Sequence, residues 1–277
     1  MKFDLRETAR DHRLIVAHRG TCGGNIPCNT MPAYETALKQ GADMLETDLN
    51  RTADGKLVLF HPGCERIQLG SQKRIPELTW EEVRTLRYRN ADQTPTQFGV
   101  EAFDDFLEAF KGRCYINIDK FWGYPREIYE TIKAHNMVDQ VLVKSEVTED
   151  VLRVLEEMAP ELPFMPIVRE VHPWHEALRN RNINYVGVEC LFRKDDSYLA
   201  SPEFMERMHR DGKLIWVNAI IYDYLEQLSG GHSDDTALCV DMEDGWGWLA
   251  DRSIDMIQTD WTGLLIQFLK DTNRYYR

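Results

Sequence analysis

Short apolar runs alternate with amphipathic segments along most of this 277-residue chain, and this alternation limits the folds that the chain can adopt. Besides the run that carries Glu46 and Asp48, we expect strands at residues 14–17, 114–119, 140–144, 164–168, 185–189, 214–218 and 256–259. Helices are predicted at residues 33–40, 103–110, 125–135, 149–158, 202–210 and 263–270, with one ending at residue 181 and a weak one after residue 218. Buried-looking strands separated by helices indicate parallel pairing.

Eight such strands favour a closed (β/α)₈ TIM barrel, the α/β fold in which each parallel strand is followed by a helix. A chain with 43% hydrophobic residues can bury one large core, and barrels of ~250 residues commonly form one domain. We therefore expect a single domain over residues 1–277. A charged, loop-like insertion at residues 62–100 would form a lid or shoulder, with a helix near residues 79–86. A doubly wound open sheet is the competing architecture.

Charged or amide side chains stand at the ends of the expected strands. The active site of a TIM barrel lies at the carboxyl ends of its strands, although charged residues at strand ends also simply mark where chains meet water. The residues selected by this rule are His18, Arg19, Glu46, Asp48, Asp119, Lys144, Arg169, Glu189, Asn218 and Asp260.

Glu46 and Asp48 are two apart in the second strand, so both carboxylates project from the same face. An isolated Glu-x-Asp more often lies on a solvated face, but two carboxylates this close repel, and a hard divalent cation is the usual neutraliser. Asp54-Gly55 predicts a tight reversal that returns His61 alongside the pair. A metal near histidines and an arginine suggests phosphate chemistry.

The order of motifs between residues 18 and 61 resembles the glycerophosphodiester phosphodiesterase family, a group of phospholipase C-like phosphodiesterase barrels. The matching motifs are His18-Arg19-Gly20, Asn29-Thr30, Gly41-Ala42-Asp43, Glu46-x-Asp48, Thr52-x-Asp54-Gly55 and His61. The resemblance implies a metal-dependent hydrolase of lipid metabolism. Such an enzyme cleaves a glycerophosphodiester, or a similar small alkyl phosphodiester, to an alcohol and a phosphomonoester such as glycerol 3-phosphate.

The resemblance also implies roles for individual residues. Acid and base catalysis would fall to His18 and His61, without an indication of which does which. The oxygen ligands would suit Ca²⁺ or Mg²⁺ and would come from Glu46, Asp48 and the third-strand acid Asp119. Trp216 would border the substrate, although an indole there can equally be a core residue. Phosphate or substrate contacts would involve Arg19, Lys144 and Lys120, with Glu189 and Asn218 as additional candidates.

One departure from the family pattern concerns the phosphate-binding lysine, which usually lies two residues beyond the third acid. Here Lys120 directly follows Asp119, and strand alternation predicts that its side chain faces outward if Asp119 faces the metal, unless the strand has already ended at that point. Lys144 ends the apolar run of the next strand, where an ammonium group could reach the same phosphate. We therefore predict that Lys144 replaces the family's lysine.

Two further departures keep other functions open. Cys28 stands where the family has Glu, and Pro62 follows His61 where the family has Asp. One alternative is a lyase related to the spider-toxin and bacterial phospholipase D enzymes, which would stop at a cyclic phosphate. The other is a non-catalytic barrel that binds a phosphorylated ligand without turnover.

Charge and hydropathy bear on partners and location. The formal net charge of −13 argues against nucleic-acid and anionic-membrane surfaces, since like charges repel. The amino terminus lacks a signal-peptide core and no run approaches the ~20 apolar residues of a membrane span, so we expect a cytoplasmic protein with a small phosphodiester substrate. The oligomeric state stays open.

The remaining cysteines and histidines have plainer interpretations. Cys114 and Cys190 lie in apolar runs and are expected to be buried thiols, whereas Cys22, Cys28 and Cys64 fall in loops near the site, where a disulfide is an open alternative. The histidines outside the motifs are expected at the surface; they are His12, His135, His172, His175, His209 and His232.

Overall fold

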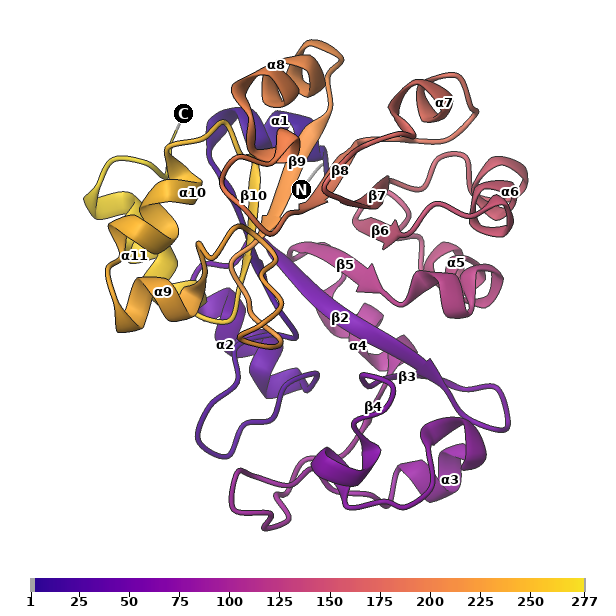
Figure 1. The fold of residues 1–277 in the computed structure, drawn as a ribbon. Helices are drawn as coiled ribbons and strands as arrows, with labels where there is room; N and C mark the ends of the chain where they lie inside the picture. Colours follow the sequence, from indigo (N-terminus) through magenta and orange to yellow (C-terminus); the bar gives the residue numbers. More distant parts are fainter. Residues whose placement is uncertain (1–2, 277) are drawn as a thin grey trace.

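The computed structural model describes residues 3–276 and contains a closed barrel of eight parallel strands (Figure 1). Neighbouring strands follow the order β1-β10-β9-β8-β7-β6-β5-β2, and β2 pairs with β1 to close the ring. The strands are β1 (Leu14–Ala17), β2 (Met44–Arg51), β5 (Tyr115–Asp119), β6 (Val141–Ser145), β7 (Phe164–Arg169), β8 (Gly187–Leu191), β9 (Leu214–Asn218) and β10 (Met256–Thr259). The barrel prediction is confirmed. An open sheet is excluded, because it would leave two edge strands unpaired, whereas β1 and β2 pair with each other here.

Helices surround the barrel, and their apolar faces pack on its outer surface (Figure 1). They are α2 (Met31–Lys39), α4 (Phe103–Phe110), α5 (Pro125–Ala134), α6 (Glu149–Glu157), α7 (His175–Arg179), α8 (Pro202–Arg210), α9 (Asp234–Cys239), α10 (Trp248–Ala250) and α11 (Thr262–Asp271). Helix α1 (Leu5–Asp11) instead contributes Leu5 and Ala9 to the apolar cluster inside the barrel. Short turns η3 (Phe121–Gly123), η4 (Tyr198–Ala200) and η5 (Glu243–Gly247) complete the ring.

The insertion leaves the barrel through an extension of β2. Strands β3 (Leu57–Leu59) and β4 (Glu101–Ala102) pair antiparallel beyond the barrel end of β2, at the bottom of Figure 1. Between them lie η1 (Glu65–Leu69), η2 (Ile75–Glu77) and α3 (Trp80–Val83), which gather a separate apolar cluster that includes Phe60 and Tyr88. The Thr79–Glu82 capping box forms as predicted, but the helix ends at Val83, short of the predicted residue 86.

The bounds of the barrel strands differ little from the predicted ones, except at β8. That strand was expected at residues 185–189 but spans Gly187–Leu191. The apolar run continues to Phe192, so the sequence pattern does not show which of its residues pair with the neighbouring strands. Glu189 therefore lies in the middle of the strand and not after it, with its side chain inside the barrel.

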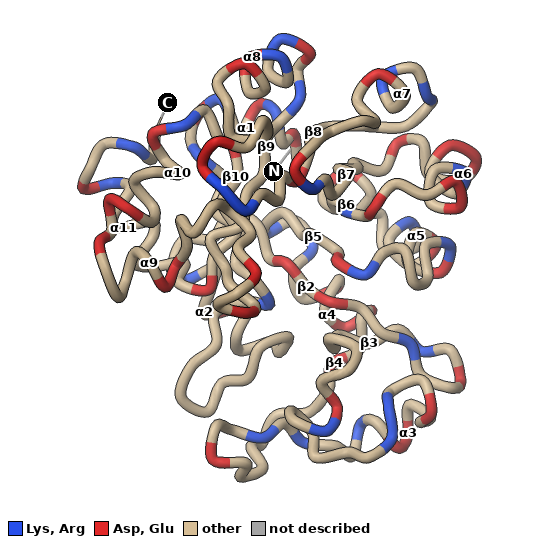
Figure 2. Tube along the Cα trace, in the orientation of Figure 1, with Lys and Arg blue, Asp and Glu red and all other residues tan. Residues whose placement is uncertain are grey.

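Charged residues of both signs are interspersed along the outer helices, as Figure 2 shows. Among the described residues, no helix is long and apolar enough to cross a membrane. The cysteines are free thiols, and Cys114 and Cys190 are buried as expected. The surface prediction for His175 is wrong: its ring is 2% exposed because its nitrogens bind the Tyr185 hydroxyl and Asp211.

Candidate active site

Three carboxylates converge at the carboxyl ends of β2 and β5. The parallel register places Asp48 directly beside Asp119, and Glu46 lies one pleat below Asp48 on the same strand. Each side chain offers one carboxylate oxygen, and these three oxygens all lie within 4.8 Å of one another. Glu46 is 2% exposed and Asp48 is fully buried, so solvent does little to screen their repulsion.

The electrostatics of this cluster favour a cation. Burial, followed by the charge of Asp48, raises the pKa of Glu46 to about 7. Burial also acts to raise the pKa of Asp119, but Lys120 and Lys144 outweigh it and the net pKa is lowered. Asp48 Oδ1 is buried and has no hydrogen-bond partner among the described residues. An all-oxygen donor set with an unsatisfied oxygen fits a hard divalent cation such as Ca²⁺ or Mg²⁺.

Arg19 connects the acids on β2 through a strained backbone. Its φ is +56°, and its backbone N–H donates to Glu46 Oε2 at 2.9 Å, while Nε lies 2.7 Å from Asp48 Oδ2. The next residue must be glycine, since a Cβ on Gly20 would lie 2.7 Å from the backbone carbon of Ala33. Burial opposes the charge of Arg19, but Asp48 and Glu46 raise its pKa overall, so the guanidinium stays charged.

Asn29 orients Asp48 from the loop before α2. Its Nδ2 donates to Asp48 Oδ2 at 3.0 Å, and its Oδ1 lies 2.9 Å from the hydroxyl of Tyr34. The backbone of Asn29 has φ +54°, which an asparagine adopts more readily than most residues. The sequence interpretation used Asn29 only as a helix-start motif, so its contact with the acidic cluster was missed.

His18 is held by an acid from the far end of the chain. Its Nδ1–H donates to Asp260 Oδ1 at 2.8 Å, which leaves the buried Nε2 without a partner among the described residues. Asp234 in turn accepts from the backbone N–H of Asp260 at 2.8 Å and from the indole of Trp246 at 2.7 Å. Asp260 was among the strand-end candidates, but Asp234 follows a long loop and carries no motif that could have singled it out.

His61 reaches the cluster from the β3 hairpin. Its Nε2 lies 3.9 Å from Asp48 Oδ1, and its Nδ1 lies 3.4 Å from Cys64 Sγ. Burial is the largest influence on its pKa, which is lowered despite the charge of Asp48.

The ring of Tyr222 lies 5.9 Å from both the His18 ring and the Arg19 guanidinium carbon, and no sequence signal had indicated this tyrosine.

Lys120 does not face outward, because the strand ends before it, which is the stated exception to the predicted orientation. Lys120 Nζ lies 2.8 Å from Asp119 Oδ2, on the cluster side and not outward. The reason is that β5 ends at Asp119 and Lys120 adopts φ +62°, so strand alternation no longer governs its side chain. Lys120 also lies 5.1 Å from the ring centroid of Trp122, which had not been anticipated.

Lys144 lies deeper than expected, in a polar network inside the barrel. It is 3% exposed, and its Nζ is 3.1 Å from Glu189 Oε2 and 3.9 Å from the ring centroid of Trp216. Asn218 Nδ2 donates to Glu189 Oε1 at 2.6 Å.

Trp216 is fully buried and lines neither of the site's two cavities, contrary to the prediction that it borders the substrate. Arg169, by contrast, is half-exposed and pairs with Glu226.

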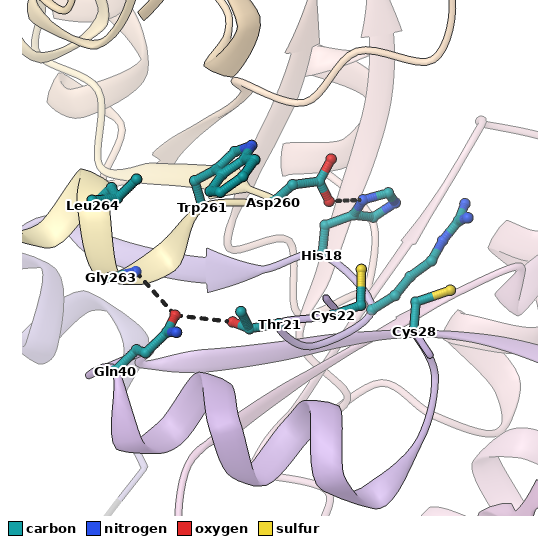
Figure 3. A pocket seen from close by; sticks show the side chains of 10 residues that line it. His18, Thr21, Cys22, Cys28, Gln40, Asp260, Trp261, Gly263 and Leu264 are labelled. Atoms are coloured by element: carbon teal, nitrogen blue, oxygen red, sulfur yellow. Dashed lines mark hydrogen bonds and ion pairs between the residues drawn. The ribbon is translucent and has the colours of Figure 1, made fainter. Parts of the chain in front are cut away.

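Two cavities flank the carboxylates. The smaller, about 240 Å³, is lined by charged and polar groups that include Asp119, Lys120 and Lys144. The larger, about 690 Å³, begins at His18 and Arg19 and runs past Trp261 (Figure 3). Arg19 lines the larger cavity and contacts both acids of β2, and Asp119 lines the smaller cavity, so the carboxylate cluster adjoins both.

Comparisons with known proteins agree with this geometry. A model described as the glycerophosphoryl diester phosphodiesterase family matches residues 18–260. A glycerophosphodiester phosphodiesterase from Caldanaerobacter subterraneus is 29% identical over 180 residues, which cover 60% of this chain and 72% of the relative. An uncharacterized Bacillus subtilis protein is 30% identical over 167 residues, covering 57% and 67% respectively.

Solved structures share the fold at low sequence identity. A glycerophosphoryl diester phosphodiesterase from Parabacteroides distasonis superimposes with a TM-score of 0.77 at 17% identity, covering 95% of this chain and 88% of that one. A phosphodiesterase from Oleispira antarctica, solved in complex with the product sn-glycerol-3-phosphate, gives a TM-score of 0.66 at 16% identity and covers 94% and 97%.

Proposed function

Because this chain belongs to the glycerophosphoryl diester phosphodiesterase family, we propose that it hydrolyses glycerophosphodiesters to an alcohol and glycerol 3-phosphate or a similar phosphomonoester. The observation that carries this proposal is the cluster of Glu46, Asp48 and Asp119, with His61 beside it and with Nε2 of His18 lacking a hydrogen-bond partner among residues 3–276. The product named for the Oleispira antarctica relative, sn-glycerol-3-phosphate, agrees with this substrate class.

The three carboxylates would hold a divalent cation, Ca²⁺ or Mg²⁺. When bound, such an ion neutralises the non-bridging phosphate oxygens and acidifies a nearby hydroxyl. Residues of the chain would hold the acids in place: Arg19 contacts Glu46 through its backbone N–H and Asp48 through its guanidinium group, and Asn29 fixes Asp48.

The histidines would divide proton transfer. His61, whose pKa is lowered mainly by burial, is neutral near pH 7 and suits the base that takes a proton from the attacking hydroxyl. In His18 the Asp260 carboxylate accepts from Nδ1–H and leaves Nε2 toward the site, where a second proton, taken up from water, would pass to the leaving oxygen as an acid requires. Tyr222 stands over His18 and Arg19 and would limit the access of water.

Turnover of glycerophosphodiesters with and without a chelator tests the proposal. We expect release of alcohol and phosphomonoester by the untreated protein, and loss of both after metal removal, with recovery on adding Ca²⁺ or Mg²⁺. Phosphorus NMR of the products distinguishes hydrolysis from lyase chemistry, since a lyase would stop at the cyclic phosphate. Binding of the diester without any turnover in metal-replete buffer would contradict the assignment as an enzyme.

Lys120, and not Lys144, is the cation that we propose for the phosphate. Lys120→Met should lower kcat/KM by about 10², because a donor aimed at the transferring phosphoryl group contributes on that order. Lys144→Met leaves the buried Glu189 carboxylate without a countercharge, and should lower the free energy of unfolding by about 3–5 kcal/mol. Kinetics and denaturant unfolding of both variants separate these effects. A larger catalytic loss at Lys144 than at Lys120, measured on the folded fraction, would restore the original prediction.

A further inference from the structure

We infer that the large cavity beside His18 binds an acyl or alkyl chain, so that the preferred substrate is an amphiphilic, lysophospholipid-type glycerophosphodiester. This inference rests on the proposed phosphodiesterase activity and specifies its substrate class. It follows from the shape of the cavity, the state of its polar groups and its place relative to the carboxylates.

The cavity lies between the loop after β1 and the start of α11, and Trp261 and Leu264 are the two large apolar side chains of its wall (Figure 3). Trp261 is 48% exposed and Leu264 is 45% exposed, although both line the cavity. Cys22 and Cys28 add two thiols, and burial raises the pKa of Cys28 to about 12, so this thiol stays neutral. Binding of an apolar ligand to such a lining is favourable, because it removes apolar surface from water.

Hydrogen bonds within the wall already engage several of its polar groups. Gln40 Oε1 accepts from Thr21 Oγ1 at 3.2 Å and from the backbone N–H of Gly263 at 3.1 Å, as the dashed lines in Figure 3 show. Asp260 Oδ1 accepts from His18. These internal contacts leave fewer partners for a hydrated headgroup, whereas an alkyl chain needs none.

The two cavities differ in the side chains that line them, and on this inference the larger would take the alkyl chain of an amphiphile and the smaller its polar group. Charged groups such as Lys120 and Glu226 line the smaller cavity together with apolar side chains. In the larger cavity, His18, Arg19 and Asp260 lie at the end nearest the carboxylates, and Trp261 and Leu264 lie beyond them. A phosphodiester held at the carboxylates, which adjoin both cavities, directs one ester substituent to each side. At ~30 Å³ per water-sized group, about 690 Å³ has room for roughly 20 such groups, far more than a glycerol moiety fills.

A chain-length series tests the inference. The substrates are glycerophosphocholine and its 1-hexanoyl, 1-octanoyl and 1-decanoyl derivatives, all below their critical micelle concentrations, in metal-replete buffer. We expect kcat/KM to rise with each added methylene by up to about fourfold, the ratio that corresponds to ~0.8 kcal/mol per buried methylene, and then to level off. Equal values for all four substrates would overturn the inference and leave the proposed function intact. No turnover of any diester would overturn both.

Two matched variants locate the chain. Leu264→Glu puts a carboxylate on the cavity wall, and Leu225→Glu makes the same change at a leucine that is 75% exposed and outside both cavities. The readout is the ratio of kcat/KM for the octanoyl substrate to that for glycerophosphocholine. The ratio should fall at least about tenfold in Leu264→Glu, since several methylenes lose their apolar contact, and stay unchanged in Leu225→Glu. An unchanged ratio in both variants, or an equal fall in both, would overturn the assignment to this cavity.

Discussion

Glu46→Gln should lower turnover of a glycerophosphodiester by about 10³ or more, which corresponds to the several kcal/mol that a bound cation supplies to the transition state. The amide keeps the size of the side chain but removes one negative charge from the three that converge within 4.8 Å. Asp119→Asn should act in the same way, because its carboxylate completes the cluster across the β2–β5 register. Steady-state kinetics together with metal binding by calorimetry measures both effects.

The control is Glu130→Gln, the same chemical change at an exposed position on α5. It should leave turnover and metal affinity unaltered. In Glu46→Gln the fold should persist, since removing one of two repelling buried carboxylates relieves repulsion in the metal-free protein. Full activity of the Glu46→Gln variant, or calorimetric metal binding as tight as in the parent, would disprove the carboxylate metal site.

His18→Ala and His61→Ala should each lower kcat by about 10² or more, because a positioned acid or base contributes on that order. A diester with a good leaving group separates the two roles. Loss of the acid matters less when the leaving alkoxide needs no proton, so His18→Ala should recover much of its activity with a nitrophenyl ester, whereas His61→Ala should not.

Circular dichroism checks that both variants remain folded, and His135→Ala serves as the control, since this histidine lies at the end of α5 and pairs only with Asp104 and Glu108 among the described residues. If the nitrophenyl ester rescued His61→Ala and not His18→Ala, the two roles would have to be exchanged. Near-normal turnover of either variant with a poor leaving group would mean that the two-histidine mechanism is wrong.

The sequence by itself determined the fold and the centre of the site, because both depend on local periodicity. Apolar strands alternating with helices favour parallel pairing, and eight of them favour the closed barrel that the structure contains. The same period of two placed Glu46 and Asp48 on one face of β2, and the parallel register then brought in Asp119. The family resemblance rested on motifs in one continuous stretch, residues 18–61, which is why it could be seen without a structure.

Tertiary structure alone decided which side chains complete the site, because those contacts join distant segments or depend on irregular backbone. Lys120 turns toward Asp119 only because its φ is +62° where β5 ends, and alternation could not predict this. Lys144 was expected at the phosphate, yet Glu189, two strands away on β8, holds it inside the barrel. Tyr222 comes from the loop after β9 and Asp234 from the first position of α9, and only the closure of the barrel brings them to His18 and to Asp260. Such contacts are set by packing between loops, for which the sequence carries no periodic signal.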